Sequence, residues 1–231
     1  MIARWRLLAI FLALAGGVDA AKIYVFYPSM ARPNVVQAAL AAKAPGHEVT
    51  VFGRLADFTA MMTTTPPDVI VVPKSLADLY KGFPVFLRGV RGGGPTGDAV
   101  LLSAGAAVDP KGIAAMNIGV VGILERGAMT PFVGGVVGGG APKLKIVTKV
   151  EDLLPLLQFK SADAVLVGED QVDEIKAKSA AQIVATPIPG AKWNFIVAGA
   201  ANDAAAKAVE PILKALGNVE KKYLGVDGWT K

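Results

Sequence analysis

Residues 22–52 read KIYVFYPSMARPNVVQAALAAKAPGHEVTVF, and this stretch decides the fold. It begins with a near-continuous apolar run, Ile23–Tyr27, which is typical of a strand covered on both faces. Residues 33–44 then show helical spacing and end at a Pro45-Gly46 stop, and residues 49–52 form a second apolar strand. Strand, helix and strand in this order predict a right-handed β-α-β unit and a largely parallel sheet.

The same alternation continues along the chain, with a glycine-rich turn at residues 92–97 between two expected strands, and it restarts once, at Asn117. Further strands are expected at 68–72, 85–90, 99–103, 117–124, 144–147, 162–167, 183–186 and 194–198, and further helices at 55–62, 75–81, 130–137, from 150, 169–178 and 203–216. The sequence therefore predicts two α/β lobes joined by a two-strand hinge. Residues 21–104 and 190–231 are expected to form lobe 1, with the tail draped on its surface, and residues 105–189 lobe 2.

The first twenty residues have the order of a secretory signal peptide. Arg4 and Arg6 precede a short apolar run, Leu7–Ala15, and small residues follow at Val18 and Ala20. The apolar run is shorter than the roughly 20 residues that a membrane-spanning helix needs. We therefore expect export, with cleavage after about Ala20.

Composition narrows the compartment and the partners. The chain has no cysteine, so neither a disulfide framework nor a lipid-modified cysteine is available, and an unanchored protein of the Gram-negative periplasm is expected. The net charge is +5, but the densest basic group (Lys214, Lys221 and Lys222) has no interleaved aromatic residues. A nucleic-acid interface needs a concentrated basic patch, so nucleic acid is not expected as a partner. A monomer is expected.

Two segments carry a family resemblance. Asp109-Pro110-Lys111-Gly112 precedes the predicted strand Asn117–Val121, and the run Val150–Leu157 precedes Ser161–Val167. This arrangement resembles lobe 2 of type II periplasmic solute-binding proteins, nearest to the phosphate- and phosphonate-binding components of ABC transporters. The resemblance implies a two-lobed α/β fold, a ligand held in the interlobe cleft, lobes that close about the hinge, and an inner-membrane transporter as partner.

Loops at the carboxyl ends of the predicted strands, or close to a crossing between lobes, supply the candidate ligand-binding residues, because open α/β sheets bind ligands at those ends. The candidates are Tyr27, Ser29, Lys74, Ser75, Glu125, Arg126, Thr130, Glu169, Trp193 and Asn194. The hydroxyls of Ser29, Ser75 and Thr130 could hold an oxyanion at a helix start. Helix capping explains each of them equally well.

The chemistry of the ligand stays open between two classes. Residues 124–131 read LERGAMTP, without the cluster of hydroxyl donors usual for anion binders. Glu125 would repel a phosphate if it points into the cleft, unless Arg126 offsets its charge or the two form an exposed pair. Several apolar side chains also stand near the expected cleft: Tyr27, Met30, Met129, Phe132 and Trp193. A hydrophobic or lipid-like ligand is therefore the alternative to a phosphate- or phosphonate-like oxyanion.

Catalysis has little support in the sequence. His47 is the only histidine and is expected at the surface, and no cysteine is available as a nucleophile. The sequence holds no cluster of His or Cys for a metal, and the glycine-rich run at 134–140 lacks the Lys and Ser/Thr of a nucleotide loop. We therefore expect that the protein is not an enzyme and binds neither a metal nor a cofactor. An exported sensor subunit, or an enzyme, is the alternative from another class.

Overall fold

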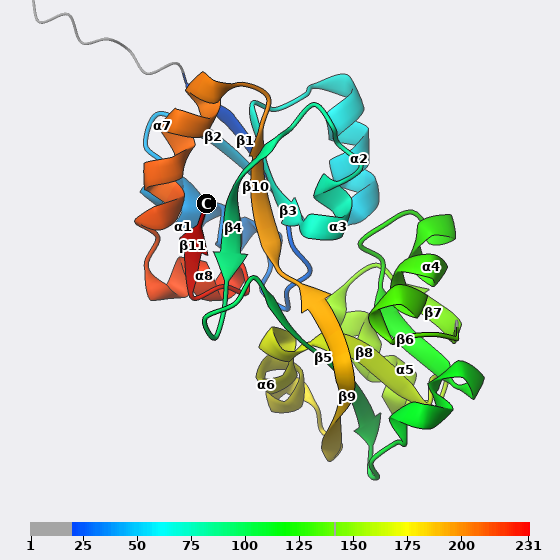
Figure 1. Ribbon diagram of the computed structural model, residues 1–231. Helices are drawn as coiled ribbons and strands as arrows, with labels where there is room; N and C mark the ends of the chain where they lie inside the picture. Colours follow the sequence, from blue (N-terminus) through cyan, green and yellow to red (C-terminus); the bar gives the residue numbers. More distant parts are fainter. Residues whose placement is uncertain (1–19, 141) are drawn as a thin grey trace, which may run out of the picture.

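The computed structural model describes residues 20–140 and 142–231 (Figure 1). In this part of the chain two β-sheets form two lobes, and each sheet carries helices on both faces. The predicted signal peptide, apart from Ala20, lies outside the described residues. None of the described helices is long and apolar enough to cross a membrane.

Lobe 1 is built on a six-stranded mixed sheet in the order β11-β4-β10-β3-β1-β2. Its strands are β1 (Lys22–Phe26), β2 (Glu48–Phe52), β3 (Val69–Pro73), β4 (Val85–Val90), β10 (Ile196–Ala200) and β11 (Gly228–Thr230). Its helices are α1 (Pro33–Lys43), α2 (Leu55–Thr64), α3 (Lys74–Ala77), α7 (Asp203–Lys214) and α8 (Asn218–Tyr223). As predicted, β1 runs parallel to β2 and β3, whereas β10 is antiparallel to β3 and β4.

Side chains along β1 alternate between two hydrophobic layers, which explains why this strand is apolar at nearly every position. Ile23 and Val25 pack in a cluster that contains the buried side chains of α1 and α7. Tyr24 and Phe26 belong to a second cluster, on the face covered by α2 and α3. Both faces of the sheet are therefore buried.

Lobe 2 is built on a five-stranded sheet in the order β7-β6-β8-β5-β9. Its strands are β5 (Thr96–Ala104), β6 (Asn117–Val121), β7 (Lys143–Val147), β8 (Ala164–Gly168) and β9 (Ile183–Asn194). Its helices are α4 (Arg126–Val136), α5 (Leu153–Gln158) and α6 (Glu169–Lys178), with 3-10 turns at Pro110–Ala115 and Val150–Asp152. The buried side chains of α4 pack on one face of the sheet, and those of α5 and α6 pack on the other.

The chain crosses between the lobes at other points than expected. Strand β5 pairs with β8 and β9, so it belongs to lobe 2, and the first crossing lies between Val90 and Thr96. The second crossing lies at Phe195, between β9 and β10, and not at residues 187–190. Pro187 and Pro189 suggested a break there, and the pairing with β5 is indeed interrupted, because Val100 pairs with Pro187 but Asp98 pairs with Lys192. The strand still continues through this bulge to Asn194, since β9 is an edge strand, where prolines and bulges are tolerated.

The C-terminal tail also differs from the expectation. It contains α8 and β11, and β11 extends the lobe 1 sheet by pairing antiparallel with β4. Its last strand is short and includes Gly228, which gives a weak strand signal in the sequence. The tail is part of lobe 1, not a segment draped over it.

Candidate functional site between the lobes

A pocket of about 380 Å³ lies between the two lobes. Lobe 1 contributes the segments that follow β1 and β2, and lobe 2 contributes Val121 at the end of β6 and residues 148–151 after β7. Four strands thus point their carboxyl ends at one space, the usual place for a ligand in open α/β sheets. The volume is at the lower end of the range for small-molecule sites.

The inner wall of this pocket is apolar. Phe26 and Phe52 come from lobe 1, and Val121 and Val150 come from lobe 2. All four side chains are buried, and only Phe52 and Val121, at 8% and 7% exposed, keep an accessible apolar surface with little hydrogen-bonding capacity. A ligand seated here would place an apolar part against them.

The rim of the pocket is polar and exposed. Arg32 and Asn34 lie at the start of α1, and Lys149 and Glu151 lie across from them on lobe 2. Within the described residues no salt bridge involves these three charged side chains. Two cations and one carboxylate leave the rim with a small positive excess, which favours a ligand with an anionic group.

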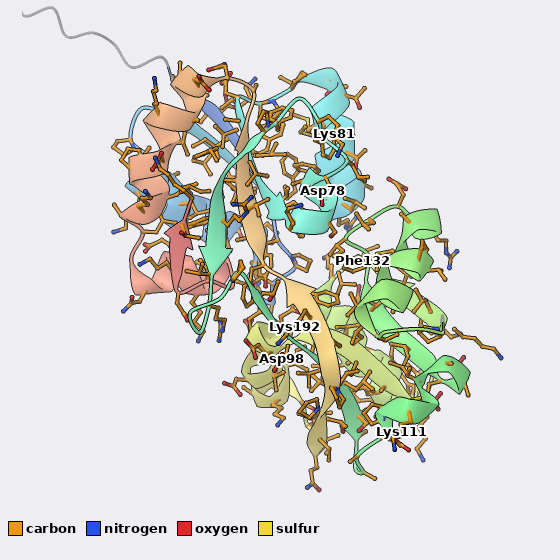
Figure 2. The ribbon with its side chains drawn as sticks, viewed as in Figure 1. Asp78, Lys81, Asp98, Lys111, Phe132 and Lys192 are labelled. Atoms are coloured by element: carbon orange, nitrogen blue, oxygen red, sulfur yellow. The ribbon has the colours of Figure 1, made fainter. Side chains whose placement is uncertain are left out.

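Beyond the apolar wall the space between the lobes is filled. The Phe132 and Trp193 rings stack edge to face, with centroids 5.7 Å apart, and Figure 2 places Phe132 on α4 beside the strand that crosses between the lobes. The void that remains beside Trp193 measures only about 10 Å³, which is room for one water molecule at most. A single hydrophobic cluster therefore continues from lobe 1, through Phe26 and Val72, into lobe 2, through Ile123 and Trp193.

A half-buried polar pair joins the lobes next to this void. The Tyr27 hydroxyl, after β1, donates a hydrogen bond to Asp170 Oδ2 at the start of α6. Burial raises the pKa of Asp170 above its usual value, although the Tyr27 hydrogen bond and the Arg91 guanidinium partly oppose the shift. Burial also raises the pKa of Tyr27 well above 10, and the Asp170 carboxylate adds to the effect. The other carboxylate oxygen of Asp170, Oδ1, is buried and has no hydrogen-bond partner among the described residues.

A second, wider groove of about 660 Å³ runs between α6 of lobe 2 and the α8 segment of lobe 1. Charged side chains of both signs line it: Arg91, Lys221 and Lys222 against Asp170, Asp173, Glu174 and Asp227. The mixed charges give no single ligand chemistry, and no group of three metal-ligating side chains occurs among residues 20–140 and 142–231. We therefore take the apolar-walled pocket as the candidate site.

Comparison with known structures agrees with this arrangement. The VFT2 domain of BvgS from Bordetella pertussis matches with a TM-score of 0.60 and 12% identity, over 90% of this chain and 92% of that chain. An amino acid ABC transporter substrate-binding protein from Streptococcus pneumoniae, bound to L-arginine, matches with a TM-score of 0.58 and 14% identity, over 88% and 92%. The GluR0 ligand-binding core in complex with L-glutamate matches with a TM-score of 0.59 and 12% identity, over 89% and 98%.

The chain has the two-lobed fold of type II periplasmic binding proteins. The predicted fold class is thereby confirmed, at a level of identity that shows the fold alone. No protein-family model matches the chain, and no curated protein matches it in sequence. The similar structures named here do not support the phosphate and phosphonate subgroup that the sequence motifs suggested.

Within this binding-protein fold, three of the ten predicted site residues lie at the interlobe space. Tyr27 and Ser29 line the pocket, and Trp193 lines the small void of about 10 Å³, to which Tyr27 also contributes. Ser29 also accepts a hydrogen bond from the Ala31 N–H at 3.0 Å, so its hydroxyl already organises the turn before α1. Asn194 is the last residue of β9, next to the second crossing.

The other six predicted residues do not line the pocket. Lys74 forms an ion pair with Asp78 at 2.6 Å, and the Ser75 hydroxyl is buried without a hydrogen-bond partner among the described residues. Glu125 lies close enough to Tyr80 of lobe 1 for its carboxylate to raise the pKa of that phenol, together with burial, the larger cause. Arg126, Thr130 and Glu169 are exposed at or near the starts of α4 and α6.

Residues that the sequence prediction missed lie at the ends of β7 and β8. Thr148 and Lys149 follow β7 and line the pocket, directly before the helix expected from residue 150, where the structure has a 3-10 turn without a side-chain cap. Asp170 and Gln171 follow β8 at the start of α6. Acidic residues are common at helix starts because they complement the helix dipole, so Asp170 gave no separate sign of a site. Applying the strand-end rule to β7 would have found Thr148 and Lys149.

His47, expected at the surface, is half-buried away from the pocket, and its Nδ1 accepts a hydrogen bond from the Ala21 N–H at 3.1 Å.

Proposed function

We propose that this chain is a periplasmic solute-binding protein that holds a small organic ligand between its lobes and delivers it to an inner-membrane transporter. The observation that carries the proposal is the pocket of about 380 Å³, to which both lobes contribute at the carboxyl ends of β1, β2, β6 and β7. The predicted signal peptide supports export. The similar structures that bind L-arginine and L-glutamate support capture of a solute rather than catalysis.

The ligand that fits this pocket best combines an apolar body with an anionic head. Phe52 and Val121 offer the body an apolar wall, and Arg32 and Lys149 can attract a carboxylate or phosphonate at the rim. Inorganic phosphate fits less well, because the buried part of the pocket offers it few hydrogen-bond donors. An organic acid therefore combines the oxyanion and the apolar chemistry that the sequence left as alternatives.

A lipid-like ligand remains the second candidate because of the apolar wall. The volume of about 380 Å³ favours a smaller molecule over a long-chain lipid. The two candidates differ in mass and in extraction behaviour, so one experiment separates them.

The test is native mass spectrometry of the protein purified from the periplasm, followed by organic extraction and by thermal-shift screening with organic acids, amino acids and phosphate. We expect the mass of a chain that begins at about Ala21. We also expect either a retained small acid or stabilisation by one of the screened acids. A retained lipid mass would support the second candidate. If no ligand is retained and none stabilises the protein at millimolar concentration, the proposal is wrong.

Rim variants test where a retained or stabilising acid binds. Replacing both rim cations (Arg32→Gln with Lys149→Gln) should weaken binding by roughly tenfold, a change of about 1.4 kcal/mol. Lys145→Gln removes an exposed cation of β7 that does not line the pocket, and it should leave the affinity unchanged. Equal effects of both replacements would place the ligand elsewhere.

A further inference from the structure

The segment Tyr27–Met30, which links β1 to α1 in lobe 1, reaches lobe 2 through the side chains of Tyr27 and Met30. Met30 is only 4% exposed, and it belongs to the hydrophobic cluster beneath α5 and α6. Every other buried member of that cluster comes from lobe 2: Val100, Leu102, Val121, Val150, Leu153, Leu154, Leu157, Val165, Val167 and Ile175. A side chain of lobe 1 thus completes the core of lobe 2.

Three side chains of α6 hold the same segment by hydrogen bonds. Asp170 accepts from the Tyr27 hydroxyl, Gln171 Nε2 donates to the Pro28 carbonyl at 2.8 Å, and Lys178 Nζ donates to the Met30 carbonyl at 3.1 Å. Gln171 is itself buried. Its amide would lose a partner in a poorly hydrated place if the segment moved away, and an unpaired buried polar group is costly.

Opening the lobes by rotation about the crossing strands would have to undo all of these contacts together. Met30 would leave a cavity in lobe 2 and become exposed to water, and the Tyr27, Gln171 and Lys178 hydrogen bonds would break. None of these contacts involves a ligand. The closed arrangement is therefore stabilised by the protein alone.

We propose that Tyr27–Met30 is a latch that keeps the two lobes closed in the ligand-free protein, so that the interlobe pocket exists before a ligand arrives. A ligand then enters past the exposed rim residues Arg32, Asn34 and Lys149, without a large rotation of the lobes. This inference departs from closure about the hinge, which the family resemblance implied. It does not depend on the identity of the ligand, and it stands or falls separately from the proposed transport role.

The test measures the distance between the lobes in ligand-free protein. Because the chain has no cysteine, an Asp57→Cys, Lys145→Cys double variant carries spin labels only on α2 of lobe 1 and β7 of lobe 2. Both positions are exposed and lie outside the pocket lining. The protein is unfolded in guanidinium, which releases any retained molecule, and is then refolded. Native mass spectrometry confirms that no ligand remains, and the distance between the labels is then measured by pulsed electron–electron double resonance.

We expect one narrow distance distribution for the otherwise unaltered protein. Combining the labels with Gln171→Met and Lys178→Met, which remove two donors to the segment, should broaden the distribution and add longer distances. Met30→Ala should do the same more strongly, with circular dichroism confirming that the lobes stay folded. Lys176→Met is the matched control, since Lys176 is an exposed cation of α6 with no hydrogen bond to lobe 1 among the described residues.

Two results would overturn the latch. A broad or two-peaked distribution in the ligand-free protein with an intact segment would mean that the lobes open spontaneously. A distribution that stays narrow when the Met30 side chain and the two donors are removed would mean that other contacts hold the lobes together. If Met30→Ala fails to fold, the polar double variant alone decides between these outcomes.

Discussion

The hydroxyl of Tyr27 and the carboxylate of Asp170 form a hydrogen bond that joins the two lobes in a partly buried site. Burial raises the pKa of Asp170 and also that of Tyr27, so both groups favour their neutral forms more than they would in an unfolded chain. Gly225 of the C-terminal tail completes the site, because it lies directly against both side chains. The stability of the folded protein should therefore depend on the charge at this point.

Asp170→Asn should change how stability depends on pH. A raised pKa in the folded state means that Asp170 favours folding below its ordinary pKa of about 3.8, and that this contribution is lost as the pH rises through the folded value. Asparagine keeps the oxygen that accepts from Tyr27 but cannot ionise. The variant should therefore gain stability relative to the unaltered protein as the pH rises from 4 to 8, measured by urea unfolding at each pH.

The control for this change is Asp173→Asn, which removes an exposed carboxylate from the same helix. The relative gain should be clearly larger for Asp170→Asn than for Asp173→Asn. A relative stability that falls with rising pH would show that the Tyr27 and Arg91 contacts outweigh burial at this carboxyl group.

Gly225→Ala should destabilise the protein by more than backbone strain alone. Gly225 has φ +68°, and a Cβ there would collide with the Tyr27 hydroxyl and lie 2.7 Å from Asp170 Oδ2. We expect a loss of about 2–4 kcal/mol in the free energy of unfolding, combining left-handed strain with the displaced side chains. Gly46→Ala, at φ +83° with no atom within 4 Å of the added Cβ, should lose only about 1–2 kcal/mol. Equal losses would remove the steric argument.

Trp193→Ala should leave a hole in the cluster shared by both lobes. Trp193 is 7% exposed and stacks against Phe132, so we expect a loss of about 3–5 kcal/mol by chemical denaturation. The comparison is Phe159→Ala, which removes a side chain that is 78% exposed and should change stability by less than about 0.5 kcal/mol. A small loss for Trp193→Ala would show that the space between the lobes is loosely packed.

Most individual elements and the fold class could be predicted from the sequence. Both lobes bury both faces of their sheets, so the strands appear as continuous apolar runs separated by helical patterns. Strand β4 (Val85–Val90) and helix α6 (Glu169–Lys178) match the prediction to the residue. The second crossing was misplaced because Pro187 and Pro189 are breakers in an isolated strand but are tolerated, with a bulge, at the sheet edge that β9 occupies. Edge position depends on strand order, which local pattern does not contain.

The candidate site was predicted only in part for the same reason. The strand-end rule found Tyr27 and Ser29, yet only the folded sheets show that the ends of β6 and β7 meet those of β1 and β2. The role of Met30 could not be predicted, since its partners in the core of lobe 2 lie at least 70 positions further along the chain. An apolar residue in a short loop carries no sign of which lobe it will complete.

Strand β10 lies between β3 and β4 in the middle of the lobe 1 sheet, but it is the next-to-last strand in the chain. Lobe 2, by contrast, is one continuous segment whose strands are all complete by Asn194. During synthesis lobe 2 can fold first, whereas lobe 1 must wait with its sheet divided until residue 200 has emerged. On the proposed export route this delay would be an advantage, because the part nearest the beginning of the chain cannot become compact before the translocation machinery receives it.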